Sequence, residues 1–329
     1  MKKKLLLAIS ILLYLTNLTA QDQEVFWLSN LPPGERQNEI KANGMHKLSS
    51  ISAGRGKVKI VQWICHGNQV LNSNYVLNSE HLDAELYCFS PLGDLQACGI
   101  DSSKLFKEIS FGNQIEGYYN LYLIQKSVRN DTLFVQAAKA ELLNHSCRNG
   151  HKDVDKKIMS HIHPEKIPIE ITRTRTRLEN LHFFVASGDK INYKVSSSSQ
   201  PLVNASVTFN THQGWQKTIK SNAEGEAVFQ VIQDYFTPWE EIDNRNIYNY
   251  LVVAEYTGEK GGIYQGQSYR YTHYTASLSD GYYPSKLMYS SLSWALGIFL
   301  FVSLLIGGGV AYHRKRRRKV YREIQLTNA

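Results

Sequence analysis

Near the C-terminal end of the chain, an uncharged apolar run is followed at once by a run of cations. Residues 294–312 read WALGIFLFVSLLIGGGVAY, and residues 313–319 read HRKRRRK. A helix needs about 20 apolar residues to cross the hydrocarbon core of a bilayer. The pattern therefore predicts a transmembrane helix over residues 289–312. It also predicts a basic tail over residues 313–329, which the positive-inside rule places in the cytoplasm.

The N-terminus carries a second apolar run. Residues 1–20 read MKKKLLLAISILLYLTNLTA, with lysines first, an apolar centre and the small residue Ala20 before Gln21. Regions of this kind in this order are typical of a secretory signal peptide. An N-terminal anchor that is never cleaved is the alternative. Both interpretations place the intervening body outside the cytoplasm, attached to the inner (plasma) membrane by a single C-terminal span.

Between the two runs, short stretches rich in Val, Ile, Tyr and Phe are separated by Gly, Asn, Asp and Ser. This texture predicts strands over KVKIVQWICHG, HLDAELYCFS, GYYNLYLIQKSV, DTLFVQAAKAEL, NASVTFNT, EAVFQV, YNYLVVAEYTG and GQSYRYTHYTASLS. We therefore predict a mainly β fold with two antiparallel β-sandwich-like domains. The first is an exported β-rich domain over residues 21–164. The second is an immunoglobulin- or transthyretin-like sandwich over residues 165–286.

The excess of positive charge lies at the two ends of the chain and does not indicate a nucleic-acid-binding surface. The sequence has 37 Lys and Arg against 29 Asp and Glu, a net charge of +8. Without the lysines of the signal peptide and the charged residues after Tyr312, which include Glu323, the exported body keeps 27 basic against 28 acidic residues. A nearly neutral body gives no electrostatic footprint for nucleic acid, so we expect no nucleic-acid partner.

All four cysteines, Cys65, Cys88, Cys98 and Cys147, lie in the exported body. An even number of cysteines in an oxidising compartment favours disulfides, with three possible connectivities. Cys88 and Cys98 flank the turn-rich segment FSPLGDLQA, which favours that pair and leaves Cys65 with Cys147. Free thiols are the alternative.

Histidines gather in one polar segment of the body. His145, His151, His161 and His163 lie close together in the sequence, and neutral imidazole is a usual ligand of nickel, cobalt, copper and zinc. His161 and His163 would share one face of a strand, because side chains alternate along a strand. We take these four histidines as the candidate metal ligands. A solvated connector between domains is the alternative.

The second half of the body carries an ordered series of short motifs. They include Pro168 and Glu170 of PIEI, Gly188-Asp189, Pro201, Leu202, Ala205 and Val207 of PLVNASV, and Ser221, Asn222, Gly225, Ala227 and Phe229 of SNAEGEAVF. Over residues 165–280 this order resembles the C-terminal β-sandwich of exported proteins that accompany nickel and cobalt uptake. It also resembles the transthyretin-like or carboxypeptidase-regulatory sandwich. The resemblance implies a Gram-negative periplasm; a eukaryotic surface protein is the alternative.

Two classes of function follow. The first is a membrane-anchored periplasmic accessory or binding protein for transition-metal uptake. It would bind nickel or cobalt and act with transporter subunits or an outer-membrane receptor. The second is a structural or protein-interaction module of the cell envelope. The chain shows no nucleophile elbow, HExxH motif or phosphate-binding loop, so we expect no enzyme activity.

Overall fold

The computed structural model describes residues 24–31, 50–52, 58–101, 103, 105–112, 117–144, 166–175, 179, 183, 185–232 and 248–317. Within these residues the chain is mainly β, as the alternation predicted, and its strands form sheets of nine, six, four and two strands. The chain divides into two compact units, residues 1–283 and residues 284–329. All the described strands belong to the first unit, and the long helix belongs to the second.

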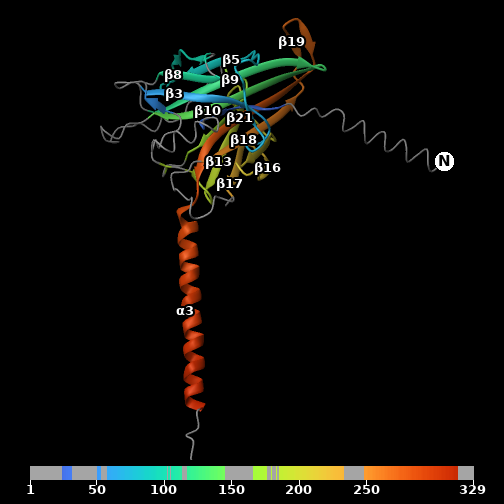
Figure 1. The fold of residues 1–329 in the computed structure, drawn as a ribbon. Coiled ribbons are helices and arrows are strands. Elements are labelled where there is room, and N and C mark those ends of the chain that lie inside the picture. Colours follow the sequence, from blue (N-terminus) through green and yellow to red (C-terminus); the bar gives the residue numbers. More distant parts are fainter. Residues whose placement is uncertain are drawn as a thin grey trace, which may run out of the picture. The chain divides into compact units, whose positions relative to one another are not determined.

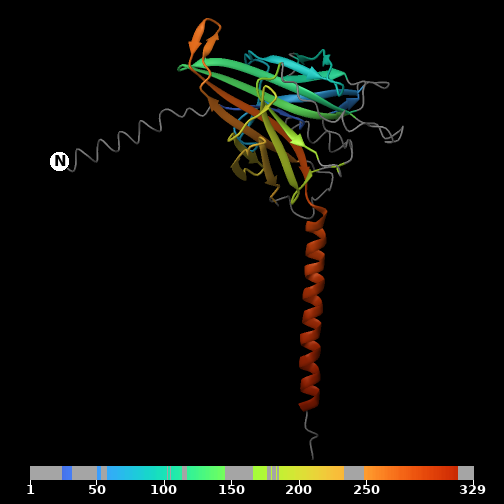
Figure 2. The same ribbon diagram turned by 180° about the vertical axis from the view of Figure 1, so that it is seen from behind.

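The nine-stranded sheet contains the longest strands of the first unit, which Figures 1 and 2 show from opposite sides. Its strand order is β16 (Gln216–Lys220), β15 (Ser206–Asn210), β18 (Tyr248–Gly258), β21 (Tyr271–Tyr283), β10 (Thr132–Asn144), β9 (Gly117–Arg129), β5 (Glu85–Phe89) and β6 (Leu95–Gln96); β12 (Val185–Ala186) also pairs with β21. β10 and β21 are parallel, with Thr132 opposite Tyr271 and Lys139 opposite Leu278. The sheet is therefore mixed, not purely antiparallel.

This parallel pairing has a consequence for the two predicted domains. β5, β6, β9 and β10 come from the segment 21–164, and the remaining strands of the sheet come from the segment 165–286. One sheet therefore runs through both segments. The predicted boundary between residues 164 and 165 lies outside the described residues, as does the predicted signal peptide. Independent folding of either segment stays a prediction.

A six-stranded sheet packs against one face of the nine-stranded sheet. It contains β1 (Phe26–Ser29), β2 (Ser50–Ser52), β3 (Val58–His66), β4 (Asn74–Tyr75), β7 (Gly99–Asp101) and β8 (Glu108–Gly112). Leu28 and Ile64 from this sheet share a buried cluster with Leu121 and Leu123 of β9. Tyr122 of β9 belongs to a different cluster, because alternate residues of a strand face opposite sides.

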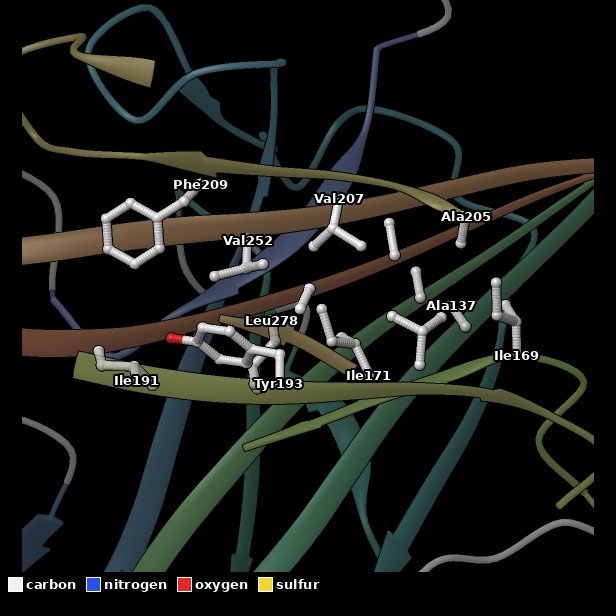
Figure 3. Close-up of a cluster of buried hydrophobic side chains, with 14 of the residues drawn as sticks. Ala137, Ile169, Ile171, Ile191, Tyr193, Ala205, Val207, Phe209, Val252 and Leu278 are labelled. Carbon is white, nitrogen blue, oxygen red and sulfur yellow. The ribbon is translucent and has the colours of Figure 1, made fainter. Parts of the chain in front are cut away.

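A four-stranded sheet packs against the opposite face. It contains β11 (Glu170–Thr174), β13 (Lys190–Ser197), β14 (Gln200–Pro201) and β17 (Glu226–Gln230). Figure 3 shows the core between them, where Ile191 and Tyr193 of β13 face Phe209 and Val252 of the nine-stranded sheet. Phe209 also stacks on the Tyr250 ring, with centroids 5.0 Å apart. The nine-stranded sheet is thus covered on both faces, which explains why its central strands are apolar on both sides.

Strand β1 is attached to the nine-stranded sheet by side chains. One edge of β1 pairs with β3. The Phe26 N–H donates to Gln136 Oε1 at 3.0 Å, and Ser277 Oγ donates to the Phe26 carbonyl at 2.6 Å. Ser279 Oγ donates to the Leu28 carbonyl in the same way. Buried backbone groups need partners, so these side chains replace a neighbouring strand.

The Gly, Asp and Asn residues of the motif series occupy turns, as their types predict, whereas others, such as Val207 and Phe229, lie in strands. Gly188 has a φ of 96°, and Asp189 Oδ2 accepts from the Ala186 N–H at 2.8 Å. Asn222 Oδ1 accepts from the Glu226 N–H at 2.7 Å in the turn that leads into β17. These contacts give the motifs a structural role, because each sets the conformation of a chain reversal.

The prediction of one continuous strand over residues 266–279 is wrong in one respect. The segment is divided into two strands at Arg270. The first part pairs as β20 (Gln267–Tyr269) with β19 (Gly262–Tyr264) in a separate two-stranded hairpin, and β21 begins at Tyr271. This hairpin forms one end of the first unit, at the N-terminal end of β21 (Figures 1 and 2). The Arg270 N–H donates to the Asp131 carbonyl at 2.9 Å, which ties the division point to the β9–β10 turn.

The second unit contains one long helix, α3 (Lys286–Arg317). Its segment Ser293–Arg317 is long and apolar enough to cross a membrane, and it has no buried residues. Trp294, Phe299 and Leu304 are each exposed. Its last turn carries Arg314, Lys315, Arg316 and Arg317. The helix confirms the long apolar element predicted from the sequence.

Candidate functional site

The predicted metal ligands His145, His151, His161 and His163 lie outside the described residues, as does Cys147. Within the described part of the chain, no group of three or more His, Cys, Asp or Glu side chains is placed to hold a metal ion. Three described histidines instead make pairwise contacts, and one of them is His273, whose Nδ1 bonds to the Thr257 hydroxyl. His66 Nδ1 contacts Glu24 Oε2, and His212 Nδ1 bonds to the Tyr282 hydroxyl.

The three described cysteines are thiols in this structure. Cys65 is buried between β1 and β18, and burial raises the pKa of its thiol. Cys88 of β5 lies in a buried cluster against which Cys98 packs, and the interaction of the two thiols raises the pKa of Cys88 and lowers the pKa of Cys98. The structure therefore brings together the two cysteines that the sequence favoured as a pair.

The most unusual group of side chains is a buried set of charges between β10 and β11. Lys139 of β10 lies 2.7 Å from Glu170 Oε1 and 3.0 Å from Glu141 Oε1, measured from its Nζ. Tyr122 of β9 donates its hydroxyl to the same Glu170 oxygen, and Lys139 also donates to Thr172 Oγ1 at 3.1 Å. Lys139, Glu141 and Glu170 are almost fully buried.

Two arginines of the same segment extend this group of charges. Arg175 Nη2 lies 2.6 Å from Glu141 Oε2, and its guanidinium lies over the Tyr118 ring, 3.8 Å from the centroid. Arg173 Nη2 lies 2.6 Å from Glu179 Oε2. Glu141 thus bridges Lys139 and Arg175, because each of its oxygens contacts a different cation. We call Lys139, Glu141, Glu170, Arg173, Arg175, Glu179, Asn120 and Asp280 the buried charge cluster.

The surroundings shift the pKa values of three members of the cluster. Burial alone would raise the pKa of Glu141, but Arg175 and Lys139 outweigh it and lower that pKa to about 2. Burial alone would lower the pKa of Lys139, but Glu170 and Glu141 raise it. Burial raises the pKa of Asp280, and the charge of Arg173 only partly opposes this. The neighbouring opposite charges thus favour the ionised forms of Glu141 and Lys139, whereas burial opposes the ionisation of Asp280.

Several polar atoms of the cluster have no hydrogen-bond partner among the described residues. Asn120 of β9 lies opposite Glu141 of β10 in the sheet and is 0% exposed, yet neither its Nδ2 nor its Oδ1 is bonded. The same holds for Glu170 Oε2, Arg173 Nε, and Arg175 Nε and Nη1. Leaving a buried polar group unbonded costs about 1–3 kcal/mol. A concentration of such atoms in one place needs a physical explanation.

The alternation of apolar and polar residues in the sequence did not predict this cluster. A signal was present, because Lys139 and Glu141 are charged residues inside a strand that is otherwise apolar. Charged residues likewise lie in and directly after the first described strand of the second half of the body, namely Glu170, Arg173 and Arg175. Lys and Glu are almost never fully buried unless they are paired, so opposite charges in two apolar strands indicate a buried pair.

Comparisons with known proteins add little to this picture. No protein-family model and no curated protein matches the sequence. Among solved structures, one that matches is a DUF4785 family protein from Legionella pneumophila, with 9% sequence identity and a TM-score of 0.18. The match covers 60% of this chain and 47% of that chain, about half the length of the Legionella protein. Such a distant likeness supports no inference about function, and the resemblance to nickel- and cobalt-uptake proteins stays a prediction.

Proposed function

We propose that the protein is a membrane-anchored binding protein of the bacterial cell envelope, with its β-structured body exported and its basic tail in the cytoplasm. The exposed apolar helix α3 carries this proposal, because an apolar segment of that length is costly to leave in water. Lys and Arg in its last turn favour a cytoplasmic C-terminus. The body would lie in the periplasm, next to the inner membrane.

The membrane proposal is tested by fractionation and by reporter fusions. The full chain should remain with the membrane pellet after extraction with alkaline carbonate, and a version that ends at Pro284 should not. A reporter that is active only in the cytoplasm should be active when fused after Ala329. An exported phosphatase fused there should be inactive. Strong phosphatase activity at the C-terminus would contradict the orientation.

Export has a chemical consequence for Cys88 and Cys98. In an oxidising compartment, a thiol oxidase that carries a reactive disulfide would accept two electrons and two protons from these thiols. The contact between the two thiols supports a disulfide at this position. It would join β5 of the nine-stranded sheet to the residue before β7 of the six-stranded sheet. Cys65 and Cys147 stay the second predicted pair.

Transition-metal uptake is the second candidate function. It is favoured by the four histidines His145, His151, His161 and His163, which the sequence places within one short segment. Titration of the purified full chain with nickel, cobalt, zinc and copper, followed by calorimetry, tests it. The double change His161→Ala, His163→Ala should abolish binding, because each imidazole removed opens a coordination position. His212→Ala, which removes a histidine bonded to Tyr282, is the matched control.

A further inference from the structure

The last turns of helix α3 carry basic residues on two different sides. An α-helix has about 3.6 residues per turn, so residues three, four and seven positions apart lie on one face. Val310, His313, Arg314 and Arg317 have this spacing, and they line one hollow in the surface of the helix. We call these four residues the Arg314 face. Its ring and guanidinium N–H groups give the hollow hydrogen-bond donors at its basic end.

The remaining cations of the last turn lie on the opposite side of the helix. Lys315 and Arg316 follow Arg314 directly, and neither of these two described residues lines the hollow. The Arg316 guanidinium lies over the Tyr312 ring, 5.8 Å from its centroid, one turn back on its own side. The helix end thus has two pairs of cations with equal charge, and of these only Arg314 and Arg317 belong to the hollow.

The Arg314 face joins a basic surface to an apolar one. Val310 lies at its apolar end and Arg317 at its basic end, about 10 Å apart along the axis at a rise of about 1.5 Å per residue. Ile306 and Gly307 lie on the same side, one turn before Val310. Ile306 is exposed, and Gly307 has open space where a side chain would begin. A ligand with an anionic end and an apolar chain matches both parts of this surface.

The charges at this end of the helix favour an anionic ligand. Residues 284–317, the described part of the second unit, contain no Asp or Glu that could pair with the cations of the last turn. Guanidinium groups bind phosphate oxygens through paired N–H donors, and two such groups lie about one turn apart on the Arg314 face. The segment Ser293–Arg317 is apolar enough to cross a bilayer, and phospholipid phosphates lie where such a segment leaves the hydrocarbon core.

We propose that His313, Arg314 and Arg317 bind the phosphate of an anionic glycerophospholipid in the leaflet at the C-terminal end of the span. An acyl chain of that lipid would lie along Val310 and Gly307. This inference rests on the proposed membrane anchor, because it requires the apolar part of α3 to lie inside a bilayer. It adds to the anchor a lipid class and a defined side of the helix, whereas general attraction to an anionic leaflet would involve every cation of the last turn equally.

Native mass spectrometry of the full chain tests the site. The protein is released from mixed micelles that hold equal amounts of phosphatidylglycerol and phosphatidylcholine with the same acyl chains. We expect about 10-fold more bound phosphatidylglycerol, because no choline cation balances the charge of its phosphate. Equal retention of the two lipids by the wild-type chain would overturn the proposal. Displacement of phosphatidylglycerol by an equal concentration of inorganic phosphate would also overturn it, because the site would then recognise a soluble anion.

Two double variants distinguish a site from general attraction. Arg314→Gln, Arg317→Gln removes two charges from the Arg314 face and should bring the two lipids to nearly equal retention. Lys315→Gln, Arg316→Gln removes the same charge from the opposite side and should keep the preference for phosphatidylglycerol. Equal losses in the two variants would overturn the proposal. Failure of the anchor itself would appear separately, as loss of the wild-type chain from the membrane pellet after carbonate extraction.

A photoreactive lipid locates the apolar part of the site without any variant. Phosphatidylglycerol with a diazirine in its acyl chain is activated in bilayers that contain the full chain, and the labelled residues are mapped by mass spectrometry. Labels should concentrate on Ile306 and Val310. Labels spread evenly around the helix would overturn the proposal.

Discussion

Ala137 of β10 lies directly opposite Ala276 of β21, and Ala276 lies opposite Ala254 of β18. All three belong to the same buried cluster beneath the four-stranded sheet. The pairing of Ala137 with Ala276 joins strands from the two halves of the chain. This row of small side chains shares its cluster with larger residues of the facing sheet, such as Ile171, and the interior of a protein is closely packed.

Replacing an alanine of this row by a larger residue should destabilise the protein. Ala137→Leu or Ala276→Leu adds volume to a filled core and should cost about 1–3 kcal/mol in the free energy of unfolding. Val228→Leu adds a methylene group at an exposed strand position and should have little effect. Chemical denaturation of the full chain in detergent, monitored by tryptophan fluorescence, measures the difference. An Ala137→Leu variant as stable as Val228→Leu would contradict the close packing of this row.

Lys139 should be far more important for stability than a surface lysine in a similar pair. Lys139→Met leaves Glu141 and Glu170 with fewer partners inside the protein, and removing one partner of a buried ion pair costs about 3–5 kcal/mol. Lys126→Met breaks the exposed pair with Glu85 and should cost about 0–1 kcal/mol. Denaturant unfolding of both variants checks the contrast. Similar losses for the two would mean that the buried contacts contribute little.

Lowering the pH should reduce the free energy of unfolding through the protonation of Glu141. The pKa of Glu141 is lowered in the folded protein to about 2 from an ordinary value of 4.5. The unfolded chain therefore takes up the proton first as the pH falls. The stability that Glu141 provides is complete above about pH 4.5 and is lost as the pH falls from there towards 2. Unfolding free energies measured between pH 6 and pH 3 should fall less steeply for Glu141→Gln than for the wild type.

The positions of most strands could be predicted from the sequence, because each strand has its own alternation and its own turns. YNYLVVAEYTG, for example, coincides with β18 from Tyr248 to Gly258. The parallel pairing of β10 with β21 could not be predicted. It joins residues far apart in the chain, and both strands are apolar enough to pair with many partners. Local patterns specify the elements, and the choice of neighbour depends on the packing of the whole body.

The candidate site was only partly predictable for a different reason. The contact of Cys88 with Cys98 follows from a short turn-rich loop, which the sequence shows directly. The buried charge cluster combines β9, β10, β11 and β21. No single segment of the sequence contains enough of it to reveal a site. Charged residues in apolar strands are the signal, and their partners become visible only once the strands are placed.

Gly225 should be sensitive to substitution because of both its conformation and its neighbours. It has a φ of 75°, and a Cβ there would lie 2.5 Å from the Val195 carbonyl oxygen. Gly266 has a similar φ of 79° with open space around it, so Gly266→Ala introduces the conformational strain alone, about 1–2 kcal/mol. Gly225→Ala should lose clearly more, and thermal unfolding compares the two. Equal losses would show that the turn before β17 can shift to accept a side chain.

Cys88 and Cys98 should form a disulfide in protein isolated from the periplasmic side of the membrane. Their thiols already contact each other in the folded body, so oxidation needs little rearrangement. Mass spectrometry of an unreduced digest, alkylated after denaturation, should find the two peptides linked and neither cysteine labelled. Reduction before alkylation should label both. Cys98→Ser should then lower the unfolding temperature, because a cross-link over a loop of this size contributes about 3 kcal/mol. Alkylation of Cys88 and Cys98 in the unreduced sample would show that the two thiols stay free despite their contact.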